Sequence, residues 1–233
     1  MRSQKSTALD TSWVLNPSDF AFLWEECKRC FYLKVREKFR RPSQPMAKIF
    51  TVIDAEMKSC YAGKRTEQVM PFLPPGVVDA SVSWVQSKPI NLPGRGSSCV
   101  IRGKIDTLVR FDDNSFAVID FKTSSRRAAH IQLYGRQLHA YALALEQAAA
   151  GHVNLSPIRI LGLLVYEPQK FAKVAGTEAS LLGGLSWIPI ERNDKKFTLF
   201  LSEILELLER PAPPAAEGCE WCQYREASRK NKF

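Results

Sequence analysis

The sequence predicts a mixed α/β fold in which a β-sheet core is flanked by helices. Two β-rich segments follow one another at residues 99–111 and 115–123, and the clearest helical segment, residues 130–149, comes next. The apolar segment at residues 158–168 is typical of a buried strand. This order of strand, strand, helix and strand favours a mixed sheet over an all-helical or all-β architecture.

The composition is that of an ordinary globular protein. The chain has 233 residues, of which 45% are hydrophobic and 24% charged. No segment reaches the eighteen or so apolar residues of a membrane span, and the polar start MRSQKSTALDTSW has no apolar signal region. We therefore expect a cytoplasmic protein with no membrane partner.

The net charge permits a nucleic-acid partner without requiring one. Lys and Arg number 33 against 24 Asp and Glu, which gives 33 − 24 = +9. A basic surface of this size can bind a polyanion, but it is also common on proteins that are simply soluble.

Two helices are expected before the β-rich region. Asn16-Pro17 favours a helix start, and apolar residues spaced three and four apart predict one helix through Phe20–Val35. A second helix is predicted over residues 46–62, ended by Gly63, with one apolar side formed by Ile49, Phe50, Ile53 and Met57.

The remaining elements complete a single domain. Residues 71–98 are rich in Pro and Gly around one strand at 80–86. After residue 168 we expect a loop containing Gly183-Gly184, a strand at 186–191 and an amphipathic helix at 197–209. Residues 1–210 are thus predicted to form one domain on whose core the N-terminal helices pack, followed by a linker and cysteine-bearing tail at 211–233.

The two central strands are predicted to form a hairpin that brings two carboxylates together. Asp112-Asp113-Asn114 is a good turn, and a hairpin centred on Asp113 places Asp106 opposite Asp120, because (106 + 120)/2 = 113. Cross-strand neighbours on one face have Cβ atoms about 5 Å apart. Lys122 projects from the same face as Asp120, since side chains alternate along a strand.

This set of side chains suits phosphodiester hydrolysis. Facing carboxylates among apolar neighbours need a cation, and oxygen donors favour Mg²⁺ or Mn²⁺. Such an ion activates a water, and a lysine beside it can position that water or stabilise the developing charge. The alternative is an internal ion pair between Asp120 and Lys122 that only helps to close the hairpin.

The helix that follows carries a second polar pair. Gln137 and Tyr141 lie four residues apart and therefore on one face of the helix at 130–149. This face either closes over the metal site or is exposed to solvent.

These motifs together resemble the PD-(D/E)XK nuclease superfamily, and most closely its branch with the RecB nuclease domain and the Cas4 exonucleases. The resemblance rests on Gly103-Lys-Ile-Asp106, on Ile119-Asp120-Phe121-Lys122-Thr123 and on Gln137-Leu-His-Ala-Tyr141. It implies a restriction-endonuclease-like fold and a metal-dependent, RecB-like or Cas4-like DNA nuclease, an exodeoxyribonuclease that hydrolyses phosphodiester bonds. It also implies DNA, as single strands or duplex ends, as the substrate, and a helicase or CRISPR adaptation proteins as partners.

The resemblance assigns a role to each matching residue. It implies Asp106, Asp120 and the backbone carbonyl of Phe121 as metal ligands, and Lys122 as the catalytic lysine. Gln137 and Tyr141 are implied as catalytic-site residues near the metal and the DNA. The branch also has a histidine ligand on the second helix, and here Asp54 stands at that position. Asp54 is therefore either a replacement metal ligand or an exposed helix acid.

The cysteines fall into two pairs and two separate residues. Two C-x-x-C pairs, Cys27/Cys30 and Cys219/Cys222, are a signature of a site for zinc or an iron–sulfur cluster. Many members of the branch bind a [4Fe–4S] cluster through one cysteine of the first helix and three of the tail, but Ser228 stands where the last would fall, and Cys30 could supply the missing ligand. The alternative is a tail held only by packing. Cys60 and Cys99 are expected to be small buried hydrophobes.

Basic residues at the end of the first helix and just beyond the catalytic strand are predicted to bind DNA. They are Lys34, Arg36, Arg40, Arg41, Arg126 and Arg127. The alternative for these charges is a solvated helix face. A second functional hypothesis is a catalytically inactive nucleic-acid-binding or partner-docking module of a DNA repair, recombination or CRISPR adaptation complex.

Overall fold

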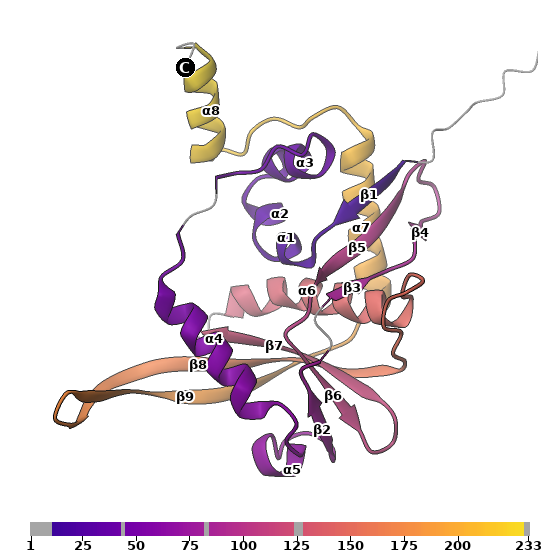
Figure 1. Cartoon of the computed structure of the whole chain (residues 1–233). Coiled ribbons are helices and arrows are strands. Elements are labelled where there is room, and N and C mark those ends of the chain that lie inside the picture. The colour runs from indigo at the N-terminus through magenta and orange to yellow at the C-terminus, as the bar shows by residue number, and fades with distance from the viewer. Residues whose placement is uncertain (1–10, 43–44, 82–83, 124–127, 231–233) are drawn as a thin grey trace, which may run out of the picture.

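The computed structural model describes residues 11–42, 45–81, 84–123 and 128–230 (Figure 1). Its larger sheet has the strand order β2 (Gly76–Asp79), β6 (Thr107–Phe111), β7 (Phe116–Thr123), β8 (Ile158–Ala175) and β9 (Glu178–Ile190). β7 and β8 are parallel, whereas the other neighbouring pairs are antiparallel. The predicted mixed α/β fold of restriction-endonuclease type is confirmed.

A second, smaller sheet is centred on β5 (Ser98–Lys104). β5 pairs in parallel with β1 (Ser12–Leu15) and antiparallel with β3 (Trp84–Gln86) and β4 (Ile90–Asn91). The predicted strand at 99–111 is therefore two strands in different sheets, interrupted at Ile105-Asp106. The interruption places Asp106 at the corner where the chain passes from one sheet to the other.

Helices cover both faces of the larger sheet. α6 (Ala128–Glu146) connects the parallel strands β7 and β8 and contacts strands of both sheets, and it runs between the two sheets in Figure 1. α4 (Lys48–Tyr61) and α5 (Thr66–Val69) cover the opposite face, where Met57 and Tyr61 pack with Ile119 and Phe121. Because side chains alternate along β7, Asp120 and Lys122 belong to the α6 face.

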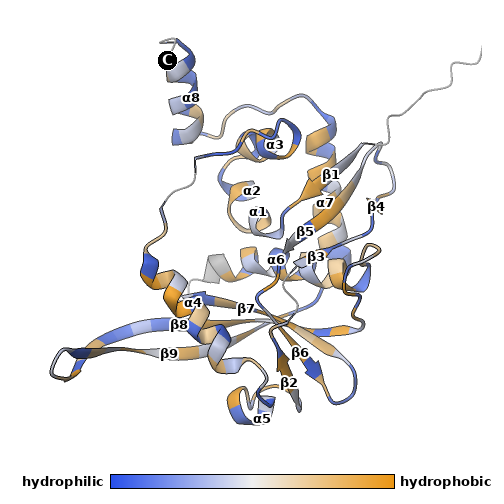
Figure 2. Ribbon diagram, in the orientation of Figure 1, coloured by the Kyte–Doolittle hydropathy of each residue, from blue (hydrophilic) through white to orange (hydrophobic). Residues whose placement is uncertain are grey.

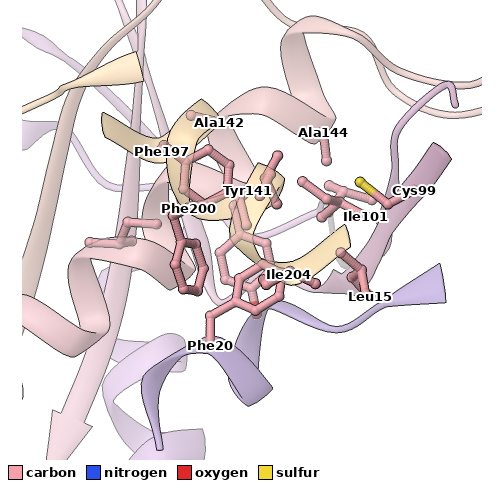
Figure 3. Close-up of a cluster of buried hydrophobic side chains, with 14 of the residues drawn as sticks. Leu15, Phe20, Cys99, Ile101, Tyr141, Ala142, Ala144, Phe197, Phe200 and Ile204 are labelled. Atoms are coloured by element: carbon pink, nitrogen blue, oxygen red, sulfur yellow. The ribbon is translucent and has the colours of Figure 1, made fainter. Parts of the chain in front are cut away.

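The N-terminal region differs from the single helix predicted. It forms α1 (Pro17–Ala21), α2 (Leu23–Glu26) and α3 (Lys28–Arg36), with Cys27 in extended backbone between the last two. α7 (Asp194–Glu209) packs against this region, and Figure 3 shows Phe20, Phe197 and Phe200 in one buried cluster with Tyr141 of α6. The apolar spacing correctly indicates which side chains are buried in this core. It does not indicate the extended backbone at Cys27 that interrupts the helix.

α4 lies within its predicted range, and Gly63 follows it with a φ of 72°. Its predicted apolar side is only partly buried, because Ile49 and Phe50 are exposed and only the C-terminal half of the helix packs on the sheet. Figure 2 shows hydrophobic residues along α4.

The predicted loop at 168–185 is wrong. β8 and β9 pair through this region, with register shifts after Pro168 and after Lys173, to a turn after Ala175. The resulting ribbon projects from the body of the molecule (Figure 1). Gly183, one of the glycines that indicated a loop, instead permits a close approach, because a Cβ there would lie 2.3 Å from the Glu167 carbonyl oxygen.

The last helix of the described residues is α8 (Glu220–Lys230), which lies beside α3. α7 begins at an N-cap, Asn193, whose side chain accepts a hydrogen bond from the Lys196 backbone at 2.9 Å. Within the described ranges, no helix has both the length and the hydropathy that crossing a membrane requires.

Candidate active site and cysteine centre

The predicted register of the central hairpin is confirmed. Thr107 pairs with Ile119 and Leu108 with Val118, so Asp106 and Asp120 are the next facing positions. Asn114 takes a positive φ of 62° in the turn, a conformation that Asn tolerates better than most residues.

The two carboxylates and Lys122 meet at the end of this hairpin. The Phe121 backbone N–H donates to Asp106 Oδ2 at 3.3 Å, and the Lys122 ammonium forms an ion pair with Asp120 Oδ2. The Lys122 Nζ atom also lies 4.6 Å from the centroid of the Tyr134 ring on α6. Asp120 is 3% exposed, so this is a buried charge cluster.

The pKa values of the two aspartates are shifted in opposite directions. Burial, together with the facing Asp106, raises the pKa of Asp120 to about 7, although the Lys122 ammonium acts against this shift. Burial also opposes ionisation of Asp106, but its hydrogen bond with Asp120 and the Lys58 ammonium lower its pKa below the ordinary value. Near neutral pH Asp120 is therefore partly protonated while Asp106 is ionised, as expected for like charges in one site.

The site fits a divalent cation by its donor atoms. Asp120 Oδ2 is buried and accepts no hydrogen bond of acceptable geometry, and the neighbouring Asp106 adds further carboxylate oxygens. Hard oxygen donors of this kind suit Mg²⁺ or Mn²⁺. The role of the Phe121 carbonyl remains a prediction.

Sequence reasoning missed a second lysine at this site. Lys58 Nζ lies 2.8 Å from Asp106 Oδ1 and 2.8 Å from Asp54 Oδ2, and so bridges α4 to the hairpin. Asp54 thus lies next to the site, and Lys58 links its carboxylate to that of Asp106. The role of Asp54 as a metal ligand remains a prediction. The i, i+4 spacing of Asp54 and Lys58 on a predicted helix was the available signal.

We expect Lys58→Met to strengthen Mn²⁺ binding at this site by at least about tenfold, because the ammonium repels a cation held by the same carboxylate. Calorimetric titration of Mn²⁺ into the variant and into wild type measures this. Lys64→Met, which removes an exposed lysine just after α4, serves as the matched control. Weaker binding in Lys58→Met would show that the lysine instead organises the site.

Gln137 and Tyr141 form a buried pair, so the solvent-exposed alternative is wrong. Gln137 Nε2 donates to Tyr141 Oη at 3.2 Å, and the two residues are 7% and 4% exposed. Burial raises the pKa of the Tyr141 hydroxyl, and the charges of Asp120 and Asp106 act in the same direction. The pair is therefore buried, and the charges of both carboxylates reach Tyr141.

Gly103 of β5 packs closely against α1 and α6. A Cβ at this position would lie 2.9 Å from Pro17 Cδ and 3.1 Å from Tyr141 Cε1. We expect Gly103→Ala to lower the free energy of unfolding by about 1–3 kcal/mol, because the proline ring at the start of α1 cannot move aside. Urea unfolding would measure it. Gly96→Ala, whose nearest neighbour would be 4.0 Å away, should leave stability unchanged, and equal behaviour of the two variants would contradict the packing argument.

The predicted DNA-binding residues have varied surroundings. Lys34 pairs with Asp19, and Arg36 Nη1 donates to the Leu208 carbonyl oxygen at 2.7 Å. Arg41 pairs with Glu26, and Arg40 is exposed. Arg126 and Arg127 lie outside the described residues. A role in DNA binding remains a prediction for all of them.

The structure brings the four paired cysteines together. Their Sγ atoms all lie within 4.8 Å of one another, and the four residues form a buried cluster with Ala215, Ala216 and Trp221 beside it. Both zinc and an iron–sulfur cluster use such thiolates. Cys99 is fully buried, as predicted, whereas Cys60 is exposed on α4, so the prediction for Cys60 is wrong.

The mixed α/β core, whose hairpin presents two facing carboxylates and a lysine, is a fold of the nuclease class. Residues 61–227 match the sequence profile of the PD-(D/E)XK nuclease superfamily. This match covers well over half of the 233 residues, and the chain belongs to that superfamily. The superfamily consists in general of hydrolytic nucleases that use divalent metals.

Two further comparisons complete this finding. None of the curated proteins matches the sequence significantly. Among solved structures, the chain is similar to one titled "Crystal structure of SSO0001", with 14% identity, a TM-score of 0.50, and coverage of 91% of this chain and 84% of that chain. At this identity the likeness concerns the fold alone.

Proposed function

We propose that the protein is a Mg²⁺- or Mn²⁺-dependent deoxyribonuclease of RecB/Cas4 type that hydrolyses phosphodiester bonds. The observation that carries the proposal is the buried set of Asp106, Asp120 and Lys122, placed by one hairpin in a chain of the nuclease superfamily. We further propose DNA, as single strands or duplex ends, as the substrate, a cytoplasmic location, and action beside a helicase or CRISPR adaptation proteins.

Each residue of the set has a distinct proposed task. Asp106 and Asp120 hold the divalent ion, which when bound activates a water and neutralises charge on the phosphate. Lys122 is charged at neutral pH, because Asp120 raises its pKa in spite of burial. A charged ammonium can donate a hydrogen bond but cannot accept a proton, so Lys122 acts by stabilising negative charge on the reacting phosphate.

The helix α6 closes the site from the other side. Gln137 and Tyr141 hold each other's polar groups in a fixed position, and the Tyr141 hydroxyl stays protonated because its pKa is raised. Tyr141 is therefore a donor for a phosphate or water oxygen. The surrounding apolar side chains exclude bulk water, which strengthens each of these charge interactions.

We expect the affinity for Mn²⁺ to fall as the pH drops below about 7. Asp120 has a pKa of about 7 in the absence of a cation, so the ion must displace a proton below that pH, and none above it. The apparent association constant should therefore fall about tenfold per pH unit below 7 and stay level above it. Titrations at pH 5.5 to 8.5 measure this, and a pH-independent affinity across that range would contradict a protonated Asp120.

The function is tested by incubating the purified protein with end-labelled single-stranded and double-stranded DNA in Mg²⁺, Mn²⁺ or chelator. Metal-dependent cleavage is the expected result. Absence of cleavage of either substrate with both metals would instead favour the inactive nucleic-acid-binding or partner-docking module.

A further inference from the structure

The separations between the four cysteine sulfurs match ligands that share a single ion. The Sγ atoms of Cys27 and Cys222 are 3.8 Å apart, and Cys30 Sγ lies 3.7 Å from Cys219 Sγ and 3.6 Å from Cys222 Sγ. Four thiolates around one zinc ion, each bond about 2.3 Å long, occupy a tetrahedron with edges of about 3.8 Å. Three of the separations therefore match the edges of a tetrahedral site, and all of them lie within 4.8 Å.

An iron–sulfur cubane does not fit the same positions. In a [4Fe–4S] cluster each thiolate ligates a different iron atom, so the ligand sulfurs are separated by the iron–iron edges as well as by their own bonds to iron. Sulfurs that all lie within 4.8 Å of one another leave no volume for such a core. The tail also offers two cysteines and not three, with a serine at position 228.

The two cysteine pairs are presented by the same local structure. Cys27 is the N-cap of α3, and Cys30 lies in the first turn of that helix. Cys219 immediately precedes α8, and the Cys222 backbone N–H donates to the Cys219 carbonyl oxygen at 3.0 Å. Two C-x-x-C pairs that each begin a helix are the ligand spacing of structural zinc sites.

Two arginines balance the charge of such a centre. Arg41 Nη2 lies 3.7 Å from Cys219 Sγ, and Arg225 Nη2 lies 3.5 Å from Cys222 Sγ. Four thiolates around one divalent ion carry a net charge of −4 + 2 = −2, which the guanidinium groups of Arg225 and of Arg41, itself also paired with Glu26, offset in part. Arg41 Nε is also buried without a hydrogen-bond partner, which leaves a further donor next to the sulfurs.

The site is closed, which distinguishes a structural from a catalytic role. All four cysteines are at least nine-tenths buried, and catalytic zinc sites instead keep one position for water or substrate. We infer that Cys27, Cys30, Cys219 and Cys222 bind one structural zinc ion, which joins α8 to α3, and that Arg41 and Arg225 hold the charged thiolates. This inference does not depend on the nuclease activity.

Metal analysis of the full chain tests the identity of the ion. The protein is purified anaerobically from cells supplied with both iron and zinc, and its metal and acid-labile sulfide contents are measured. One zinc ion per chain with no sulfide is expected. About four iron atoms with four sulfides, or no bound metal, would overturn the inference. No DNA is present, so the outcome is separate from that of the cleavage assay.

Variants test the ligands and the arginines. Cys222→Ser should lose the zinc, whereas Cys60→Ser, which removes the exposed cysteine of α4, should keep it. Arg225→Gln should lower zinc retention against a competing chelator by about 10–100-fold, with Arg229→Gln as its control.

Cobalt provides a readout that does not require a folded variant. Wild-type protein in which Co²⁺ replaces the metal should show the intense visible absorption of a tetrahedral tetrathiolate ion. The weak spectrum of an octahedral ion, or zinc retention by Cys222→Ser equal to that of Cys60→Ser, would overturn the assignment.

Discussion

Asp120→Asn should abolish DNA cleavage while leaving the fold intact. The amide keeps the shape of the side chain but removes the negative charge that would hold the cation next to Lys122. Loss of the bound ion removes several kcal/mol of transition-state stabilisation, and about 4 kcal/mol corresponds to roughly a 1000-fold lower rate. Single-turnover cleavage of an end-labelled strand in Mn²⁺ measures the effect.

A second aspartate of the same hairpin provides the control. Asp112 is exposed at the turn and pairs with Arg65, an interaction of a kind worth at most about 1 kcal/mol. Asp112→Asn should cleave at the wild-type rate. Comparable rates for Asp120→Asn and Asp112→Asn would remove Asp120 from the catalytic site.

Gly162→Ala should substantially lower the stability of the larger sheet. A Cβ on Gly162 would lie 2.1 Å from Trp187 Cη2 and 2.5 Å from Cζ2. The indole is stacked on Phe72 with ring centroids 5.1 Å apart, so it can yield only by losing this contact. We expect a loss of about 3 kcal/mol in the free energy of unfolding, which corresponds to a Tm lower by about 6–12 °C.

Thermal unfolding followed by circular dichroism checks this value. Gly135→Ala is the matched control, because its Cβ would lie at an ordinary 3.4 Å from Ile190 Cγ2 and alanine is favoured in a helix by up to about 1 kcal/mol. The control should be unchanged or slightly more stable. A Gly162→Ala protein as stable as wild type would mean that Trp187 does not pack over β8 as described.

The central hairpin could be predicted because its information is local. A turn at Asp113 and the two-residue period of a strand fix which residues face each other, and the observed register agrees. The predicted set of Asp106, Asp120 and Lys122 therefore assembled as expected. The cysteine pairs were recognised in the same way, from spacing alone.

The parts that could not be predicted depend on contacts between distant segments. Lys58 reaches Asp106 only because α4 packs across β7. Its i, i+4 spacing from Asp54 indicates the pair within the helix but not the contact with Asp106. Cys27, at the break between α2 and α3, lies 3.8 Å by its sulfur from Cys222 of α8, at the other end of the chain. The glycines after Pro168 predict a loop because glycine is common in turns. In the structure Gly183 instead lies in a strand, where the absence of a side chain allows the facing backbone at Glu167 to approach closely.

The most direct test of the central claim is to measure Mn²⁺ binding and DNA cleavage on the same preparations of wild type and the double variant Asp106→Asn/Asp120→Asn. The facing aspartates should make one site, so binding and cleavage by wild type should saturate over the same range of Mn²⁺ concentration, and the double variant should lose both. Cleavage that persists in the double variant, or that survives chelation in wild type, would contradict the account.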